Sequence, residues 1–155
     1  MKNFVKIAAV SALLAAPLPA VAATGNVQFD ATVNNTCGIT VQQAGLLTAN
    51  VGQTVLSSTN AGGSAGVAEV VATSNNYTVS IDQPTAFSAA PAGGGTNVNF
   101  AATYSASGAT TVASTAAANP LLTGTTSVNV NMSATKTSGS FPTGTYAAIV
   151  VLRCE

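Results

Sequence analysis

Hydrophobic and polar residues alternate along most of the chain, and no segment shows a sustained apolar stripe with the 3.6-residue period of a helix. Alternation with a period of two places successive side chains on opposite faces of a β-strand. It recurs in residues 27–33, 37–41, 68–72, 77–82, 98–104, 128–134 and 146–154, whereas the Ala- and Thr-rich residues 109–118 are ambiguous. The pattern predicts an all-β protein with about six or seven strands, and their spacing is typical of a β-sandwich.

One pair of these segments is joined by a turn signal. Asn75-Asn76 separates residues 68–72 from residues 77–82, and each segment alternates between apolar and polar positions. Asn is common in tight turns because it tolerates the left-handed backbone conformation. We therefore expect a β-hairpin between the two strands.

The last predicted strand is apolar on both faces. Ile149 and Val151 add apolar side chains to the face opposite Ala148, Val150 and Leu152. No further strand follows in the sequence, so we expect this strand to be an exposed sheet edge. Such an edge is a template for pairing with another chain. The predicted strand before Cys37 is the candidate to fill it.

The first 23 residues have the organisation of a secretory signal peptide. Lys2 and Lys6 precede an apolar run, and small residues follow at positions 20–23. A membrane-spanning helix needs about 20 unbroken apolar residues. Pro17 and Pro19 interrupt the run, so we expect cleavage after Ala22 or Ala23, export, and no membrane span.

The composition excludes several classes of function. Only 5% of the 155 residues are charged, histidine is absent, and Ser, Thr and Asn supply nearly a third of the chain. Without histidine, His-dependent catalysis and His-rich zinc sites are excluded, and four basic residues do not make a nucleic-acid surface. Asp30, Glu69 and Asp82 each stand singly on the polar side of a strand, which favours surface charge over a calcium site. We expect no enzyme activity, metal or cofactor.

The two cysteines lie near opposite ends of the exported chain. Cys37 follows the first predicted strand and Cys154 is in the last one, and they lack the C-x-x-C spacing of redox sites. An even number of cysteines in an exported protein favours a structural disulfide. A bridge between subunits is the alternative to one within the chain.

The two ends of the chain resemble the subunits of chaperone-usher pili. The run Gly25-Asn26-Val27-Gln28-Phe29-Asp30-Ala31-Thr32-Val33 before Cys37 is similar to the donor segment of these pilins, Gly-x-Val-x-Phe-x-Gly-x-Val. Gly144-Thr145-Tyr146 before an apolar strand is similar to the archaic, spore coat U type. Where type-one pilins have glycine this chain has Ala31, and the family's second cysteine, expected near Ala72, is missing. Cys154 is the candidate to replace it.

The resemblance implies an incomplete immunoglobulin-like β-sandwich that is completed by a donor strand from another subunit. Residues 24–34 would be the donor strand and residues 35–155 the pilin domain. The donor side chains would be Gly25, Val27, Phe29, Ala31 and Val33, and the acceptor groove would be lined by Tyr146, Ala148, Val150 and Leu152. The implied partners are identical subunits in a head-to-tail filament, a periplasmic chaperone and an outer-membrane usher.

The expected product is a cell-surface fimbrium that supports adhesion or biofilm formation. A monomeric, secreted β-sandwich that binds carbohydrate or acts as an adhesin is the alternative. A small outer-membrane barrel would need aromatic girdles and lipid-facing apolar residues on every strand, which this alanine-rich chain hardly provides.

Overall fold

The computed structural model describes residues 22–155, in which there are ten strands and no helix. The expected signal peptide, residues 1–23, lies outside the described residues except for its last two positions. The chain divides into a segment that ends at Thr32 and a unit Val33–Glu155, and the ten strands belong to this unit. The prediction of an all-β protein is confirmed. No helix that could cross a bilayer occurs in residues 22–155.

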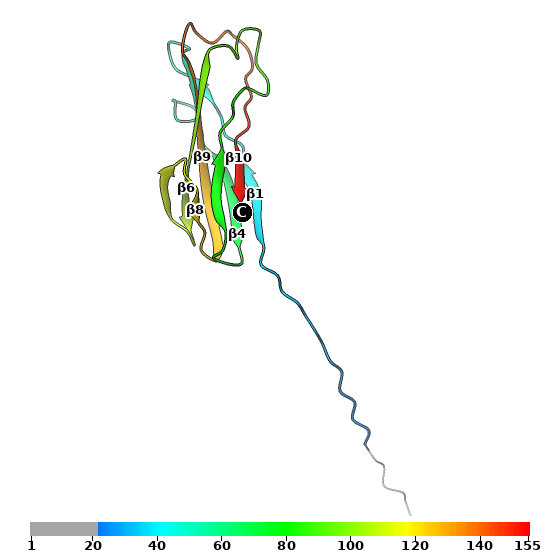
Figure 1. The fold of residues 1–155 in the computed structure, drawn as a ribbon. Coiled ribbons are helices and arrows are strands. Elements are labelled where there is room, and N and C mark those ends of the chain that lie inside the picture. Colours follow the sequence, from blue (N-terminus) through cyan, green and yellow to red (C-terminus); the bar gives the residue numbers. More distant parts are fainter. Residues whose placement is uncertain (1–21) are drawn as a thin grey trace, which may run out of the picture. The chain divides into compact units, whose positions relative to one another are not determined.

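Two antiparallel sheets make up the unit Val33–Glu155 (Figure 1). The larger sheet is centred on β9 (Gly124–Lys136), which pairs on one side with β6 (Val98–Gly108). On its other side β9 pairs with β4 (Gly66–Ala72) and β3 (Val55–Ser57). The outer strands are β1 (Cys37–Gln43) beside β4, β2 (Thr48–Ala49) beside β3, and β7 (Val112–Thr115) beside β6. The smaller sheet has the order β10 (Val151–Cys154), β5 (Thr78–Asp82) and β8 (Asn119–Pro120).

The long central pair β6–β9 follows the predicted alternation. The two strands pair continuously from Val98 opposite Lys136 to Gly108 opposite Thr126. Their inward positions are buried: Ala102, Tyr104 and Ala106 on β6, and Val128, Met132 and Ala134 on β9. Polar residues between them occupy the other face, because successive strand residues point to opposite sides. β7 lies within the ambiguous residues 109–118 and extends this sheet.

The two sheets share one core, which is compatible with a β-sandwich. Val70 and Val128 of the larger sheet pack in the same cluster as Val79 of the smaller sheet, and all three are fully buried. Tyr104 crosses the core, because its hydroxyl donates to the Val79 carbonyl at 3.1 Å and lies 2.9 Å from the Ala117 carbonyl. The Asn119 amide donates to the same hydroxyl at 2.8 Å. The buried phenol therefore has polar partners, as burial of a hydroxyl requires.

The predicted hairpin between residues 68–72 and 77–82 is wrong. Both strands form, as β4 and β5, but β4 pairs with β1 and β9 while β5 pairs with β10 and β8. A hairpin would put the apolar sides of both strands on one face of one sheet. By crossing to the other sheet, the chain makes Val70 and Ala72 face Val79 inside the shared core. Asn75 serves this crossing, because its side-chain oxygen accepts hydrogen bonds from the Thr123 backbone N–H and hydroxyl.

The last strand is shorter than predicted. Of residues 146–154, only Val151–Cys154 form a strand, β10, which pairs with β5. In the remainder of this segment, residues 146–150, the backbone pairing consists of one isolated β-bridge, between Ala147 and Ala89. Apolar alternation continues through these residues, but a strand also needs a neighbour whose backbone it can pair with.

Candidate functional site

An apolar groove lies between the larger sheet and residues 141–152, with a volume of about 850 Å³. Its lining includes buried side chains from three strands of the larger sheet, Leu56 of β3, Ala68 of β4 and Met132 of β9. Phe141 is also buried and lines the groove. None of the residues that line the groove is charged. The groove therefore suits an uncharged, apolar occupant.

The four residues predicted to form the acceptor edge all line this groove. Tyr146, Ala148, Val150 and Leu152 are half-buried. Tyr146, Ala148 and Val150 pack against the cluster that contains Met132, whereas Leu152 packs against the cluster that contains Val70. Ile149, between two of them, is 65% exposed. The predicted alternation of this segment is present although most of it is not in a strand.

The backbone of the same segment has unpaired polar groups. Within residues 22–155, residues 148–150 exchange no backbone hydrogen bond with other parts of the chain. Directly after β10, Glu155 and Thr78 exchange two backbone hydrogen bonds, at 2.7 and 3.1 Å. Because such pairs alternate along an antiparallel ladder, Leu152 and Cys154 direct their N–H and C=O groups away from β5. One side of this edge is therefore free to pair with an additional strand.

The opposite wall of the groove is β1, which is also an edge strand. Ile39 and Val41 of β1 pair with Val70 and Ala68 of β4, so their side chains lie on the same face as these buried residues. Nevertheless Ile39 is 36% exposed and Val41 is 73% exposed. The apolar face of the larger sheet thus continues onto β1, where the described residues leave it uncovered.

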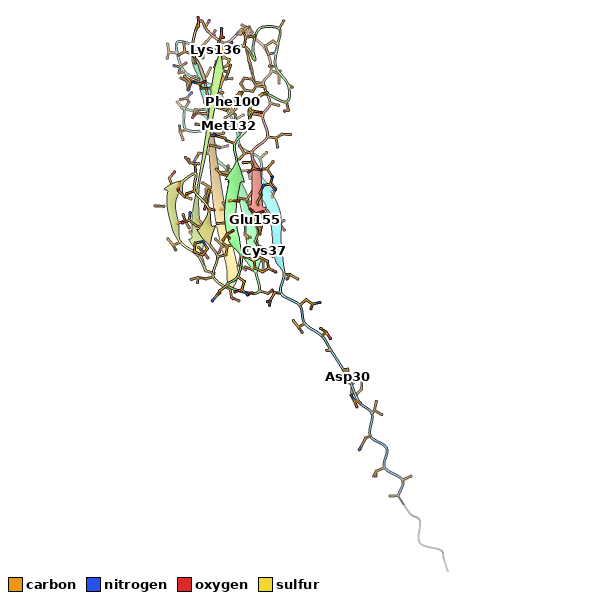
Figure 2. The ribbon with its side chains drawn as sticks, viewed as in Figure 1. Asp30, Cys37, Phe100, Met132, Lys136 and Glu155 are labelled. Atoms are coloured by element: carbon orange, nitrogen blue, oxygen red, sulfur yellow. A yellow bond between two sulfur atoms is a disulfide. The ribbon has the colours of Figure 1, made fainter. Side chains whose placement is uncertain are left out.

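A disulfide between Cys37 and Cys154 joins the two edges. It connects β1 of the larger sheet to β10 of the smaller sheet, which lie side by side (Figure 1), and Figure 2 shows Cys37 close to the end of the chain at Glu155. Cys154 is two residues beyond Leu152, the last residue of β10 that lines the groove. The expected disulfide is present within the chain, and it closes the groove at this end.

Four aromatic rings pack together at the other end of the groove. Phe87, Phe100, Phe141 and Tyr146 make edge-to-face contacts, with ring centroids between 4.9 and 6.0 Å apart. The Lys136 ammonium lies 5.2 Å from the Phe141 ring and donates hydrogen bonds to two carbonyls of the loop 93–96. These contacts hold the groove-lining faces of Phe141 and Tyr146 in place.

Charge and ionisation contribute little to the groove. Partial desolvation raises the pKa of Tyr146 above the ordinary value for a phenol. Arg153 of β10 pairs with Asp82 of β5, and the hydrogen bond that Arg153 donates to the Asp82 carboxylate raises the pKa of Arg153. Residues 22–155 contain no cluster of three or more residues that could bind a metal ion.

The predicted donor residues lie in the segment before the sheets. Residues 24–34 form no strand, which corrects the prediction of a strand here for the chain taken alone. Val27, Phe29 and Val33 are 76%, 90% and 92% exposed, and Gly25 and Ala31 are also exposed. An extended segment without a partner has no ladder to join. Large apolar side chains at such exposure are unusual when they recur at every second position.

Sequence reasoning missed several residues that shape the groove. Leu56, Met132 and Phe141 line it but come from three separate parts of the chain, and only their apolar character was visible in the sequence. The adjacent pair Leu46-Leu47, in an otherwise polar stretch, was a signal that could have been used, since both residues line the groove.

Comparisons of the chain with protein-family models, with curated proteins and with solved structures found no match.

Proposed function

We propose that this protein is a structural subunit of a bacterial surface pilus and that it polymerises head-to-tail by donor-strand exchange. In this proposal residues 35–155 are an immunoglobulin-like β-sandwich that lacks one strand, and residues 24–34 of another subunit supply that strand. The observation that carries the proposal is an uncharged apolar groove bounded by two unpaired strand edges, β1 and β10. Binding by β-augmentation uses such edges for affinity and side-chain pockets for register.

Donor and acceptor have matching lengths and patterns. Val27 to Val33 and Tyr146 to Leu152 each span seven residues and carry an inward side chain at every second position. At about 3.3 Å per residue, each segment is about 20 Å long as a strand. A donor strand in this register would therefore give residues 148–150 the backbone partners that they lack within one chain.

Burial of the donor side chains would make the joint between subunits strong. Val27, Phe29 and Val33 are largely exposed, and full burial of such side chains contributes about 1.5 to 3 kcal/mol each. Together they supply roughly 5 to 9 kcal/mol before the backbone hydrogen bonds are counted. Ile39 and Val41 of the acceptor would lose exposed area at the same time. We expect slow dissociation of neighbouring subunits.

The closed end of the groove favours one direction for the donor strand. Residues 34–37 continue the donor chain into its own sheets, so they must leave the groove, and the disulfide leaves them only the end near Phe141 and Tyr146. After removal of the signal peptide, the other end of the donor segment can stop beside the disulfide. The donor strand would then run antiparallel to β10. A donor and an acceptor on different parts of one subunit make a contact that does not close into a ring, and this generates a filament.

The exposed groove is the reason why the subunit would need a chaperone and an usher before it assembles. A long apolar groove with free strand edges is prone to aggregation in a folded subunit. A periplasmic chaperone that lends a strand would cover it, and an outer-membrane usher would exchange that strand for the donor of the next subunit. The fimbrium would be displayed at the cell surface, where it would support adhesion or biofilm formation.

The test uses two complementary full-length variants. Val27→Asp/Phe29→Asp disables the donor, and Val150→Asp disables the acceptor. Each variant alone is expected to stay monomeric, whereas an equimolar mixture gives a heterodimer and nothing longer, as measured by size-exclusion chromatography with light scattering. The matched control is Ile149→Asp, because Ile149 is 65% exposed on the same segment and its substitution should leave assembly intact.

The competing function, a monomeric secreted module that binds carbohydrate or acts as an adhesin, predicts another result. The unmodified protein and all variants would then elute as monomers, alone and mixed. That outcome, with each variant shown to be folded by its cooperative thermal unfolding, would overturn the proposal.

A further inference from the structure

We propose that the Cys37–Cys154 disulfide prevents the chain from inserting its own residues 24–34 into its own groove, so that the donor segment remains free for another subunit. This inference rests on the proposed function, because it concerns access to the same groove. It gives the disulfide a specific role. With the bridge in place the subunit cannot complete its own fold as a monomer, and it assembles into a filament instead.

The connection between donor and groove makes self-insertion a real alternative. Residues 34–36 are Asn-Asn-Thr, which favour a tight turn, and they lead directly into β1. A three-residue loop at this place would pair Val33 with Cys37, Ala31 with Ile39 and Phe29 with Val41. This register puts the apolar side chains of the segment on the inward face, because Ile39 and Val41 share that face with Val70 and Ala68. The free edge of β1 would pair with the returning strand.

The disulfide removes the space that this arrangement needs. A strand between two neighbours holds them about 9.5 Å apart, since adjacent strands are 4.7 to 4.9 Å apart. The Cα atoms of Cys37 and Cys154 are only 6.2 Å apart. Val33 therefore cannot lie between them, and the hairpin cannot start at this end of the groove.

The chain is also fixed beyond the bridge. The Thr36 carbonyl accepts a bond from the Thr73 N–H at 3.0 Å, and the Thr36 N–H donates to the Thr73 hydroxyl at 2.7 Å. Thr36 thus continues the pairing of β1 with β4 past Cys37, away from the groove. The donor segment of a different subunit avoids this constraint, because it can reach the groove from the opposite end.

The sheet register offers a variant that moves the bridge without removing it. Cys37 lies directly opposite Ala72 in the β1–β4 pair. Cys37 and Ala72 form a non-hydrogen-bonded pair of the antiparallel ladder. The Cα atoms of such a pair are about 4.5 Å apart, which is within the range for a disulfide. In Ala72→Cys/Cys154→Ser, a Cys37 bridge to position 72 stays inside one sheet and leaves β10 free. The chain keeps a disulfide, and the end of the groove is opened.

The experiment compares four proteins, each isolated as its monomer fraction by size-exclusion chromatography and measured before it assembles. They are the unmodified protein, its Phe29→Asp variant, Ala72→Cys/Cys154→Ser, and the latter with Phe29→Asp. Mass spectrometry after alkylation verifies each bridge. Two properties are measured: hydrogen exchange of residues 25–33, and uptake of a labelled synthetic peptide of residues 24–34 at about 1 μM. A tethered segment acts at an effective concentration on the order of millimolar, so self-insertion should reduce peptide uptake by about 1,000-fold.

We expect residues 25–33 to exchange freely in the unassembled monomer of the unmodified protein and to be protected in the monomer of Ala72→Cys/Cys154→Ser, where peptide uptake is lost. Adding Phe29→Asp to the latter should remove the protection and restore uptake. Unchanged exchange and uptake in Ala72→Cys/Cys154→Ser would overturn the inference. Loss of uptake that Phe29→Asp fails to restore would overturn it too, because the bridge would then act by shaping the groove. Failure of the Phe29→Asp variant with the native bridge to take up peptide would instead refute the proposed function.

Discussion

Truncation of Phe29 separates the stability of a subunit from the stability of the joint between subunits. In the single chain Phe29 is 90% exposed, so its replacement by Ala removes almost no buried contact. The free energy of unfolding of the isolated subunit should change by less than about 0.5 kcal/mol, as for other surface substitutions. In the assembled state the same ring is expected to fill part of an apolar groove.

The magnitude for the joint follows from burial of the ring. Truncation of a well-packed Phe to Ala costs about 3 to 5 kcal/mol, because both the transfer free energy and the contacts around the resulting cavity are lost. At 1.4 kcal/mol for each factor of ten, the joint should dissociate more readily by a factor of about 10² to 4 × 10³. Substitution of Gln28, the exposed neighbour on the other face of the segment, is the matched control.

The assay is a denaturant titration of assembled fibres, followed by the loss of multimers on gels, together with denaturant unfolding of the monomer. Phe29→Ala should lower the midpoint for fibre dissociation and leave the monomer midpoint unchanged, while Gln28→Ala should change neither. Equal fibre midpoints for Phe29→Ala and Gln28→Ala would refute the assignment of Phe29 as an anchor of the joint.

Three further predictions concern the unit that carries the groove. Tyr104→Phe should lower the free energy of unfolding by about 1 to 3 kcal/mol, because the Val79 carbonyl loses the hydroxyl donor inside the buried core; an unchanged value in a denaturant melt would contradict this. Gly94→Val should slow peptide uptake, since even a Cβ at position 94 would come within 2.8 Å of the Tyr146 ring; wild-type kinetics in a fluorescence binding assay would argue against it. Lys136→Met should increase hydrogen exchange in the loop 93–96, whose carbonyls Lys136 holds, and unaltered exchange there would show that the ammonium does not restrain the loop.

The sequence predicted individual strands well because burial on one face leaves a period of two. Val128 and Met132 of β9 and Tyr104 of β6 are buried as their alternation predicts. The Cys37–Cys154 pairing was also predictable, since two cysteines without C-x-x-C spacing leave few choices. These features depend on local pattern or on simple counting, and both are properties that the sequence displays directly.

Pairing between strands was less predictable. The segment between Ala72 and Thr78 has the composition of a hairpin turn, yet it crosses from one sheet to the other, because the apolar faces of β4 and β5 bury each other. Local turn chemistry is the same in both arrangements, and only the packing of the whole core distinguishes them. The predicted length of the last strand was wrong for a related reason. Residues 148–150 are apolar but have no neighbouring strand to pair with.

The sequence was sufficient to predict the residues along one edge of the groove, but not the residues that line it from β3, β9 and the loop after β9. Tyr146, Ala148, Val150 and Leu152 follow one another along a single alternating segment. Leu56, Met132 and Phe141 meet only because β3 and β9 pair and residues 137–145 fold back over them. The position of the disulfide at one end of the groove likewise depends on which sheet edges lie side by side.

The most direct test of the account is an electron cryo-microscopy structure of the fibre formed by the purified protein. The account predicts that a strand fills the groove beside residues 146–152, that it runs antiparallel to β10, and that its side chains are those of residues 25–33 of the neighbouring subunit. A groove filled by the subunit's own residues 25–33, or subunits joined through other surfaces, would contradict it.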